Sequence, residues 1–356
     1  MENAKRNLLH IEVIRLIAAF FVIFNHLAGE GYTLFLAYPP SSFQHWLYLF
    51  FSMLCKINVP LFFMISGALL LKKQEEPFKK QLYRILRIVI VLAVFSLLEY
   101  IHELIFYGGS FQISYYFQKL IEDSWMIPYW FLYAYLGFLL TLPLLRRLAN
   151  AMKEREFQYM ILLVVLVGGL LPMVISLILG RDFSFSPYFT IAWVTSGIVC
   201  FPLLGHYLEN VLDIRKITGF WLCIIWLISI GCLILTCVLT SRKSIETGFI
   251  SETYVSSLVM VYSLAIYVSF RKLLTSHPLK GKPARFLQVL GSCTFGVYLM
   301  HGFLLSHPKL SLVHLITKNE PQLPLIAGFL RCFEIMIPLL FLTWLLKKIP
   351  GVRKLL

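Results

Sequence analysis

Arg15 and His26 are the first residues whose types and spacing suggest chemistry, because both lie within a long apolar run over residues 10–29. On a helix, eleven positions advance by about three full turns, so the two side chains share one face, roughly 16 Å apart. Glu12 lies one turn before Arg15 and joins that face. An Arg inside a membrane span costs several kcal/mol unless it is paired or faces a cavity. A cation near one membrane face and an imidazole near the other indicate a reagent held across the membrane.

The composition is that of a membrane protein. Of 356 residues, 59% are hydrophobic and only 14% are charged. Apolar runs of about 20 residues recur along the whole chain, which predicts an all-α polytopic membrane protein with about ten transmembrane helices. The predicted spans are 10–29, 46–71, 84–107, 128–148, 157–180, 188–209, 217–240, 250–271, 286–306 and 323–347.

The distribution of Lys and Arg predicts the orientation. A net charge of +14 would suggest a nucleic-acid partner in a soluble protein, but here the basic residues cluster in alternate short loops. The two tails and the even-numbered loops carry 23 of them, the other loops carry 6, and Arg15, Lys56 and Arg331 fall within spans. The positive-inside rule then places both termini in the cytoplasm. We expect one transmembrane domain over residues 1–356, no separate soluble domain and no nucleic-acid partner.

Arg84 and Arg87 begin the third predicted span and share one helix face, because they are three positions apart. One interpretation is ordinary anchoring of the span at the cytoplasmic surface. The alternative is a phosphate site, in which the pair, together with Arg15, would grip a cytosolic polyphosphate.

The outer ends of the third and fourth spans carry candidate acceptor-binding residues. Glu99, His102 and Glu103 form either a solvated interfacial cluster or an acceptor site lined with carboxylates. Tyr129 and Trp130, in an aromatic stretch, form either an interface belt or a platform on which sugar rings stack. Composition alone does not separate these alternatives.

Two further polar pairs lie inside late spans. Tyr298 and His301 are helical neighbours in the ninth span, and Arg331 and Glu334 are neighbours in the last. The simplest interpretation of the second pair is mutual neutralisation, although such a pair normally faces the protein interior or a wet cavity. We expect no metal site, since the seven cysteines lie in apolar runs without CxxC spacing.

In this order and spacing, the segments resemble acyltransferase family 3, the integral-membrane acyltransferases that modify bacterial cell-surface glycans. The resemblance covers nearly the whole chain. Two departures are Glu12, where the family more often has Asp, and Tyr129, where many members have His. The residues that carry the resemblance are Glu12, Arg15 and His26; Phe62, Phe63, Ser66 and Gly67; Arg84 and Arg87; Trp130 to Tyr133; and Phe295, Gly296, Tyr298, Leu299 and His301.

The resemblance implies transfer of an acyl group from cytosolic acyl-CoA to a hydroxyl of an extracytoplasmic or lipid-linked sugar, at a bacterial cell membrane. Acetyl-CoA is the expected donor. Arg15, with Arg84 or Arg87, would hold the CoA phosphates. The pantetheine arm would then run along a narrow strip formed by Ala19 and Val22.

His26 would meet the thioester at the outer end of this path. As a general base it would take the proton of the attacking hydroxyl, and an acyl-His intermediate is the alternative. Glu12 would orient Arg15 or pair with Arg331, and the sequence does not choose between these partners.

Two other functions fit parts of the pattern. One is a non-enzymatic transporter or exporter of a glycan or lipid-linked intermediate. The other is an enzyme of the unrelated membrane-bound O-acyltransferase fold, in which the essential His lies late in the chain, so His301 would replace His26. The oligomeric state is open, and a homo-oligomer is one of the states that fit.

Overall fold

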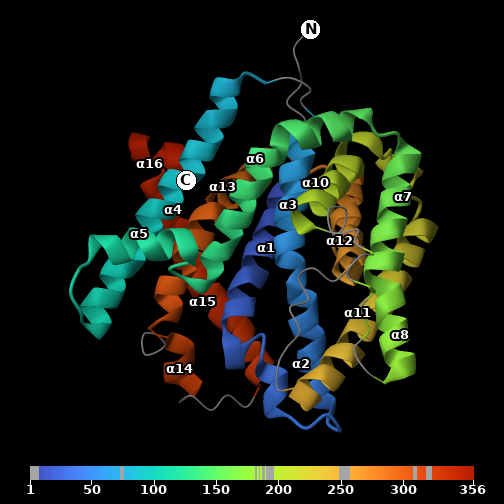
Figure 1. The fold of residues 1–356 in the computed structure, drawn as a ribbon, viewed down its shortest axis with the longest axis horizontal. Helices are drawn as coiled ribbons and strands as arrows, with labels where there is room; N and C mark the ends of the chain where they lie inside the picture. Colours follow the sequence, from blue (N-terminus) through green and yellow to red (C-terminus); the bar gives the residue numbers. More distant parts are fainter. Residues whose placement is uncertain are drawn as a thin grey trace.

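The computed structural model describes residues 8–72, 76–180, 183, 185, 186, 189, 196–247, 257–307, 311–317 and 323–356. Across these ranges the chain forms helices joined by turns and contains no strand. Figure 1 shows the long helices side by side, most of them running between the same two ends of the molecule. The predicted all-α class is therefore confirmed.

The helices follow one another in the order expected from the apolar runs. Their bounds are α1 (Leu9–His26), α2 (Phe43–Leu54), α3 (Asn58–Leu70), α4 (Phe78–Tyr107), α5 (Ile113–Glu122), α6 (Trp130–Ala151), α7 (Glu154–Val165), α8 (Leu171–Leu179), α10 (Gly197–His206), α11 (Gly219–Thr247), α12 (Ser257–Ser276), α13 (Gly281–Leu305), α14 (Leu312–Thr317), α15 (Pro324–Leu346) and α16 (Pro350–Leu355). The short turn Cys55–Ile57 joins α2 to α3, and a π turn over Leu166–Leu170 joins α7 to α8.

Nine helical segments within the described ranges are long and apolar enough to cross a membrane. They correspond to nine of the ten predicted spans. The remaining prediction, 188–209, lies partly on residues 188 and 190–195, which are outside the described residues. Its described part contains α10, which is only 10 residues long. The chain is thus a polytopic helical membrane protein.

The first turns of α1 and the end of α15 lie at the same end of the bundle. The Nζ atom of Lys347, directly after α15, donates to the backbone oxygen of Ser292 on α13 at 2.8 Å. On the same helix, a Cβ at Gly291 would overlap the side chain of Glu12, so the first turns of α1 lie there too. We call this the Arg15 end of the bundle, and the opposite one the His26 end.

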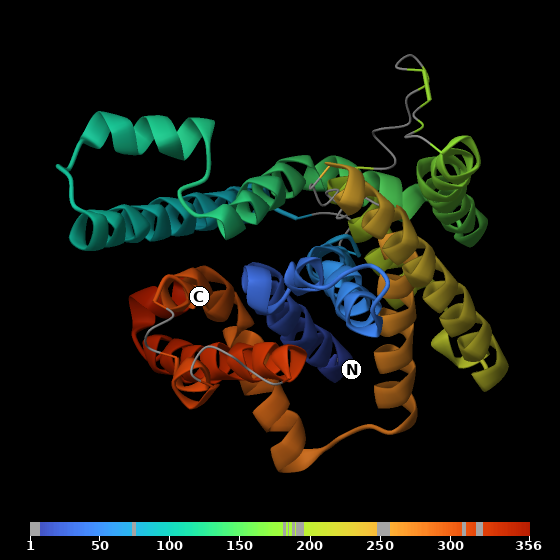
Figure 2. The ribbon, with the colours of Figure 1, turned by 90° about the horizontal axis from the view of Figure 1, so that it is seen from below.

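Helix α1 is the centre of the bundle. Figure 2 shows it between α2 and α3 on one side and α13 and α15 on the other. Small residues permit the closest approaches, since a Cβ at Gly67 would overlap the backbone of Pro202, and one at Gly205 would overlap that of Met64. These contacts join α3 to α10. On the other side, Gly291 lets α13 approach α1 at Glu12, which positions the polar residues of the Arg15 end.

Candidate active site

Arg15 is held by Glu12. The Nη1 atom of Arg15 donates to both carboxylate oxygens of Glu12, at 2.9 and 3.0 Å. Arg331 instead donates to Glu334 at 2.9 Å, so Glu12 takes the first of the two roles that the sequence left open. Among the described residues, the hydrogen bonds of Arg15 all involve Nη1, which leaves its other N–H donors for an anion.

A cavity of about 340 Å³ begins beside Arg15. Its Arg15 end is polar and carries Arg87 and Ser292, whereas its far end is aromatic. The full lining is Arg15, Phe62, Ile65, Ser66, Arg87, Ile88, Phe131, Tyr135, Gly291, Ser292, Thr294, Phe295, Tyr298 and Leu356. Cations at the mouth and apolar walls inside suit a ligand with an anionic head and a slender, mostly apolar arm.

Arg87 and Lys347 add to the positive charge at this mouth. Arg87 donates through Nε to the backbone oxygen of Leu355 at 3.0 Å, and its guanidinium lies 5.6 Å from the ring of Phe295. Lys347 is anchored on Ser292, which lines the cavity. Burial lowers the pKa of Lys347, and repulsion from Arg87 acts in the same direction. Lys347 is not among the predicted site residues, because a basic residue after the last span is explained by membrane orientation alone.

Arg84 does not reach the cavity. Its Nη2 donates to Oε1 of Glu76 at 2.7 Å, and Arg146 donates to the other oxygen of Glu76 at 2.6 Å. Lys80 adds a third cation at 3.0 Å. The hydrogen bond from Arg84 is the largest cause that holds the pKa of Glu76 well below its usual range. Arg84 is therefore committed to a buried ion cluster that joins α4 to α6.

The strip of Ala19 and Val22 does not line the cavity. Their side chains are buried in the core, with 1% and 5% of their surface exposed. The physical reason is the close packing of α13 on α1, which Gly291 permits beside Glu12. The expected path along α1 is therefore covered, and the cavity runs between α3, α4, α6 and α13 instead.

His26 and His301 meet at the other end of α1. Nδ1 of His26 lies 2.7 Å from the oxygen of Val22, and Nδ1 of His301 lies 2.7 Å from the oxygen of Tyr298. Carbonyl oxygens only accept, so both rings carry a proton on Nδ1. Nε2 of His301 lies 3.4 Å from Nδ1 of His26 and accepts from it. Among the described residues, Nε2 of His26 has no hydrogen-bond partner, which leaves its lone pair for a substrate proton.

Tyr298 lies between the cavity and the His pair. Its ring lines the cavity and lies 6.1 Å, centroid to centroid, from that of His301. Its hydroxyl donates to the oxygen of Pro128 at 2.6 Å, and the edge of its ring meets Phe131 at 5.6 Å. A single aromatic layer thus separates the inner end of the cavity from the two imidazoles.

A family model for an acyltransferase domain matches residues 8–348. The chain belongs to acyltransferase family 3. No curated protein and no solved structure matches it. The match includes both histidines and every residue that lines the cavity except Leu356. The match supports a membrane acyltransferase, the main function expected from the sequence.

In this acyltransferase, a buried polar cluster lies beside the His pair. Lys56, only 3% exposed, donates to Oδ1 of Asn25 at 3.1 Å, and its Nζ lies 3.7 Å from the ring centroid of Tyr32. Asn25 directly precedes His26. The cluster ties the last turn of α1 to the turn between α2 and α3, and thereby fixes the backbone that carries His26.

The remaining candidate acceptor residues are not gathered in one cavity. Tyr129 is fully buried and donates to the oxygen of Leu299 at 2.9 Å, so it packs α6 onto α13. Trp130 is 37% exposed at the start of α6, and Glu99 is nearly buried on α4. Glu334 accepts from Ser311 at 2.9 Å as well as from Arg331, which holds the segment before α14 against α15.

Proposed function

We propose that this membrane acyltransferase moves an acyl group, with acetyl as the expected one, from cytosolic acyl-CoA to a hydroxyl of an extracytoplasmic or lipid-linked sugar in a bacterial cell membrane. One observation carries the proposal. A single cavity begins at Arg15 and ends at Tyr298, whose ring contacts His301, and His301 is hydrogen-bonded to His26. The cationic mouth and the general base are thus linked by one cavity and one aromatic layer, which Tyr298 would have to leave open for the thioester to reach His26.

The mouth suits the phosphates of CoA. Arg15, Arg87 and Lys347 come from three different elements and lie around one opening, and guanidinium groups bind phosphate through paired N–H donors. A volume of about 340 Å³ is at the small end of ligand pockets, which span about 300–1,000 Å³. The pantetheine arm and a short acyl group would fill it, while the nucleotide would lie at the mouth.

The loop charges support the sidedness that this function needs. The tails and loops at the Arg15 end of the predicted topology carry 23 Lys and Arg, against 6 on the other side. The positive-inside rule favours the Arg15 end in the cytoplasm, where acyl-CoA is made. His26 would then meet acceptors from the outer side.

The His pair has the arrangement that base catalysis requires. Nε2 of His26 would take the proton of the sugar hydroxyl while the sugar oxygen attacks the thioester carbonyl. The carbon–sulfur bond then breaks, and the thiolate of CoA takes the proton back from His26. Throughout, the Val22 oxygen and His301 hold Nδ1–H and keep the reactive lone pair aimed. The alternative is an acyl-His26 intermediate. It would be detected as radiolabelled acetyl that stays bound to the protein when the acceptor is withheld.

The test is transfer of radiolabelled acetyl from acetyl-CoA to endogenous glycans in membranes that contain matched amounts of each variant. We expect His26→Ala to lower transfer by about 10²–10⁴-fold. His277→Ala, at an exposed histidine between α12 and α13, is the matched control and should transfer normally. Near-normal transfer by His26→Ala would overturn the mechanism, and unlabelled glycans with the wild type would overturn the function.

A further inference from the structure

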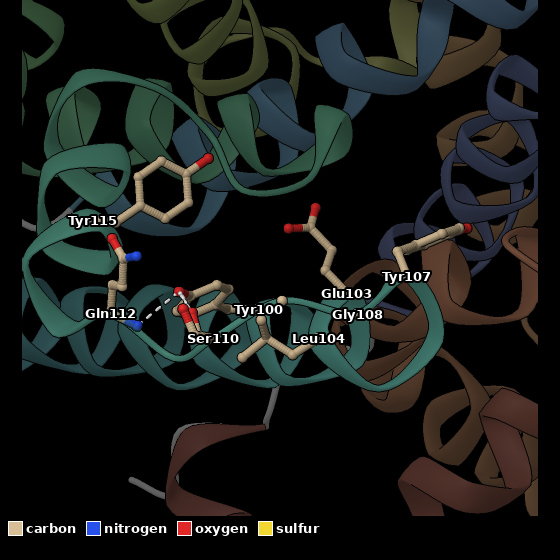
Figure 3. A pocket seen from close by; sticks show the side chains of 9 residues that line it. Tyr100, Glu103, Leu104, Tyr107, Gly108, Ser110, Gln112 and Tyr115 are labelled. Carbon is tan, nitrogen blue, oxygen red and sulfur yellow. Dashed lines mark hydrogen bonds between the residues drawn. The ribbon is translucent and has the colours of Figure 1, made fainter.

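A groove of about 450 Å³ lies between the last turns of α4 and the beginning of α5. Figure 3 shows its lining, in which the Tyr115 ring and the Glu103 carboxylate rise on the same side of the α4 ribbon. Leu104, Tyr107 and Gln112 also line the groove. The cavity of the active site has an entirely different lining, so this is a separate site.

The backbone of the groove is held in place. The turn after α4 needs positive φ angles, 81° at Gly108 and 124° at Gly109, which glycine adopts without strain. The Tyr100 hydroxyl then accepts from the backbone N–H of Gln112 at 2.9 Å and donates to the oxygen of Ser110 at 3.3 Å. Tyr100 is itself packed on Trp125, with ring centroids 4.5 Å apart. A groove fixed in this way binds a ligand with little ordering cost.

The lining suits a sugar. Tyr107 and Tyr115 are 75% and 47% exposed, although large aromatic rings are normally covered. The face of a pyranose ring presents C–H groups that pack on such rings, and its hydroxyls donate to carboxylate and amide oxygens. Of the described residues that line the groove, only Glu103 carries a charge, and a carboxylate favours a neutral or amino sugar over an anionic ligand.

The groove lies on the acceptor side of the His pair. His102, next to Glu103, lies with its Nε2 2.9 Å from Nε2 of His307 and meets the ring of Phe303 edge-on at 5.6 Å. Phe303 follows His301 by two residues on α13. Neither His26 nor His301 lines the groove, so a sugar ring held there is a different unit from the one that meets His26.

Helix α5 carries the groove at the height of the membrane surface. Ile113, Phe117 and Ile121 recur every four residues and are 57%, 53% and 79% exposed, which makes one apolar stripe. An amphipathic helix of this kind lies at the boundary of headgroups and acyl chains, with the stripe toward the lipid. Sugars attached to lipids or at the cell surface pass at this level.

From these observations we infer that the α4–α5 groove is a second sugar-binding subsite, which takes a pyranose unit of the acceptor next to the unit that is acylated. The inference rests on the proposed function, and it specifies that function further, because it makes the acceptor an oligosaccharide or polysaccharide. Affinity should therefore increase with the number of sugar units.

Binding is tested on the full-length wild type in nanodiscs. The probes are maltose oligomers and N-acetylglucosamine oligomers of one to six units, followed by saturation-transfer NMR. We expect longer oligomers of at least one series to bind more tightly than the single sugar. Tyr107→Ala should weaken this binding roughly two- to tenfold, because one ring contact is lost, and Glu103→Gln should weaken it as well. Phe117→Ala removes another exposed ring, which lies outside the groove, and should change nothing.

The results separate this inference from the proposed function. Binding is measured without acyl transfer, so a failure of His26→Ala in the catalytic test leaves the comparison of wild type, Tyr107→Ala and Phe117→Ala intact. Oligomers that bind no better than single sugars, or Tyr107→Ala and Phe117→Ala variants with the same affinity, would overturn the subsite. Tyr107→Ala should bind a lipid-anchored oligomer more weakly than the wild type does, by the same factor as for the free oligomer. If only the anchored oligomer bound more weakly, recognition of the sugar itself would be overturned.

Discussion

Nε2 of His301 lies 3.4 Å from Nδ1 of His26, although 275 positions separate the two residues in the chain. His301 is fully buried on α13, whereas His26 is half-buried at the end of α1. Each ring uses its Nδ1–H to bind a backbone oxygen, so their tautomers are fixed together. The two histidines, which the sequence offered as rivals for the essential base, thus form one unit with distinct roles.

The first prediction concerns these roles. His301→Ala should lower kcat by about 10- to 100-fold, less than the loss in His26→Ala, because His301 positions the base without taking the substrate proton. The KM for acetyl-CoA should stay within about a factor of two, since His301 does not line the donor cavity. Steady-state kinetics in proteoliposomes measures both constants. Wild-type kcat in His301→Ala, or a larger loss than in His26→Ala, would contradict these assignments.

The second prediction concerns the donor. Arg15→Gln and Arg87→Gln should each raise the KM for acetyl-CoA about 10- to 100-fold, since a hydrogen bond to a charged group contributes about 1.5–3 kcal/mol. Free CoA should compete less well with these variants in the same proportion.

Arg84→Gln is the matched control for the donor site. It removes the same charge three positions from Arg87, but its side chain is bound to Glu76 outside the cavity. The KM should therefore remain near the wild-type value, while the thermal midpoint of the purified protein falls. A rise in KM equal to that in Arg87→Gln would place the CoA phosphates on Glu76's cluster instead.

The third prediction concerns the aromatic layer at the inner end of the cavity. Phe131→Ala should enlarge the space next to Tyr298, because the ring of Phe131 both lines the cavity and packs on Tyr298. We expect the ratio of kcat/KM for butyryl-CoA to that for acetyl-CoA to rise about tenfold, because the two extra methylene groups of butyryl gain contacts. Phe51→Ala, at a half-buried ring packed on Phe329 away from the cavity, should leave the ratio unchanged. An unchanged ratio in Phe131→Ala would show that the acyl group lies elsewhere.

The features that could be predicted from the sequence are those that depend on the periodicity of a single helix. Apolar runs identified nine of the spans, and a spacing of three placed Glu12 against Arg15, because both patterns follow from the geometry of one helix. The contact of His26 with His301 depends on how α1 packs against α13, which no pattern within either helix encodes. Nor could the sequence predict where the cavity lies, because its lining depends on the packing of α13 against α1 at Gly291 and Glu12.

The difference between Arg84 and Arg87 was also beyond the sequence. The two residues are 60° apart around α4 and nearly equivalent by pattern. A carboxylate from the preceding loop, Glu76, binds Arg84 and leaves Arg87 at the cavity. A Glu in a loop between basic residues gives no signal of this kind, because its role depends on Arg146 from α6.

The fourth prediction concerns this ion cluster. Glu76→Gln should destabilise the protein by about 3–5 kcal/mol near neutral pH, because Arg146, only 4% exposed, would lose its counter-charge. The thermal midpoint of the purified protein in detergent, followed by tryptophan fluorescence, should fall clearly. Glu122→Gln, at an exposed carboxylate at the end of α5, is the matched control and should shift the midpoint little.

The stabilisation that Glu76 provides should depend on pH in a defined direction. The pKa of Glu76 is lower in the folded protein than the ordinary value of 4.5, mainly through its hydrogen bond from Arg84. Its contribution to stability is therefore fully present above about pH 4.5 and is lost as the pH falls toward the folded pKa. The midpoints of the wild type and Glu76→Gln should differ by a constant amount from pH 8 to about pH 5 and converge below that. A difference that grows on acidification would mean that the carboxyl is protonated in the folded protein, and Arg84 and Arg146 would then be neutralised by another group.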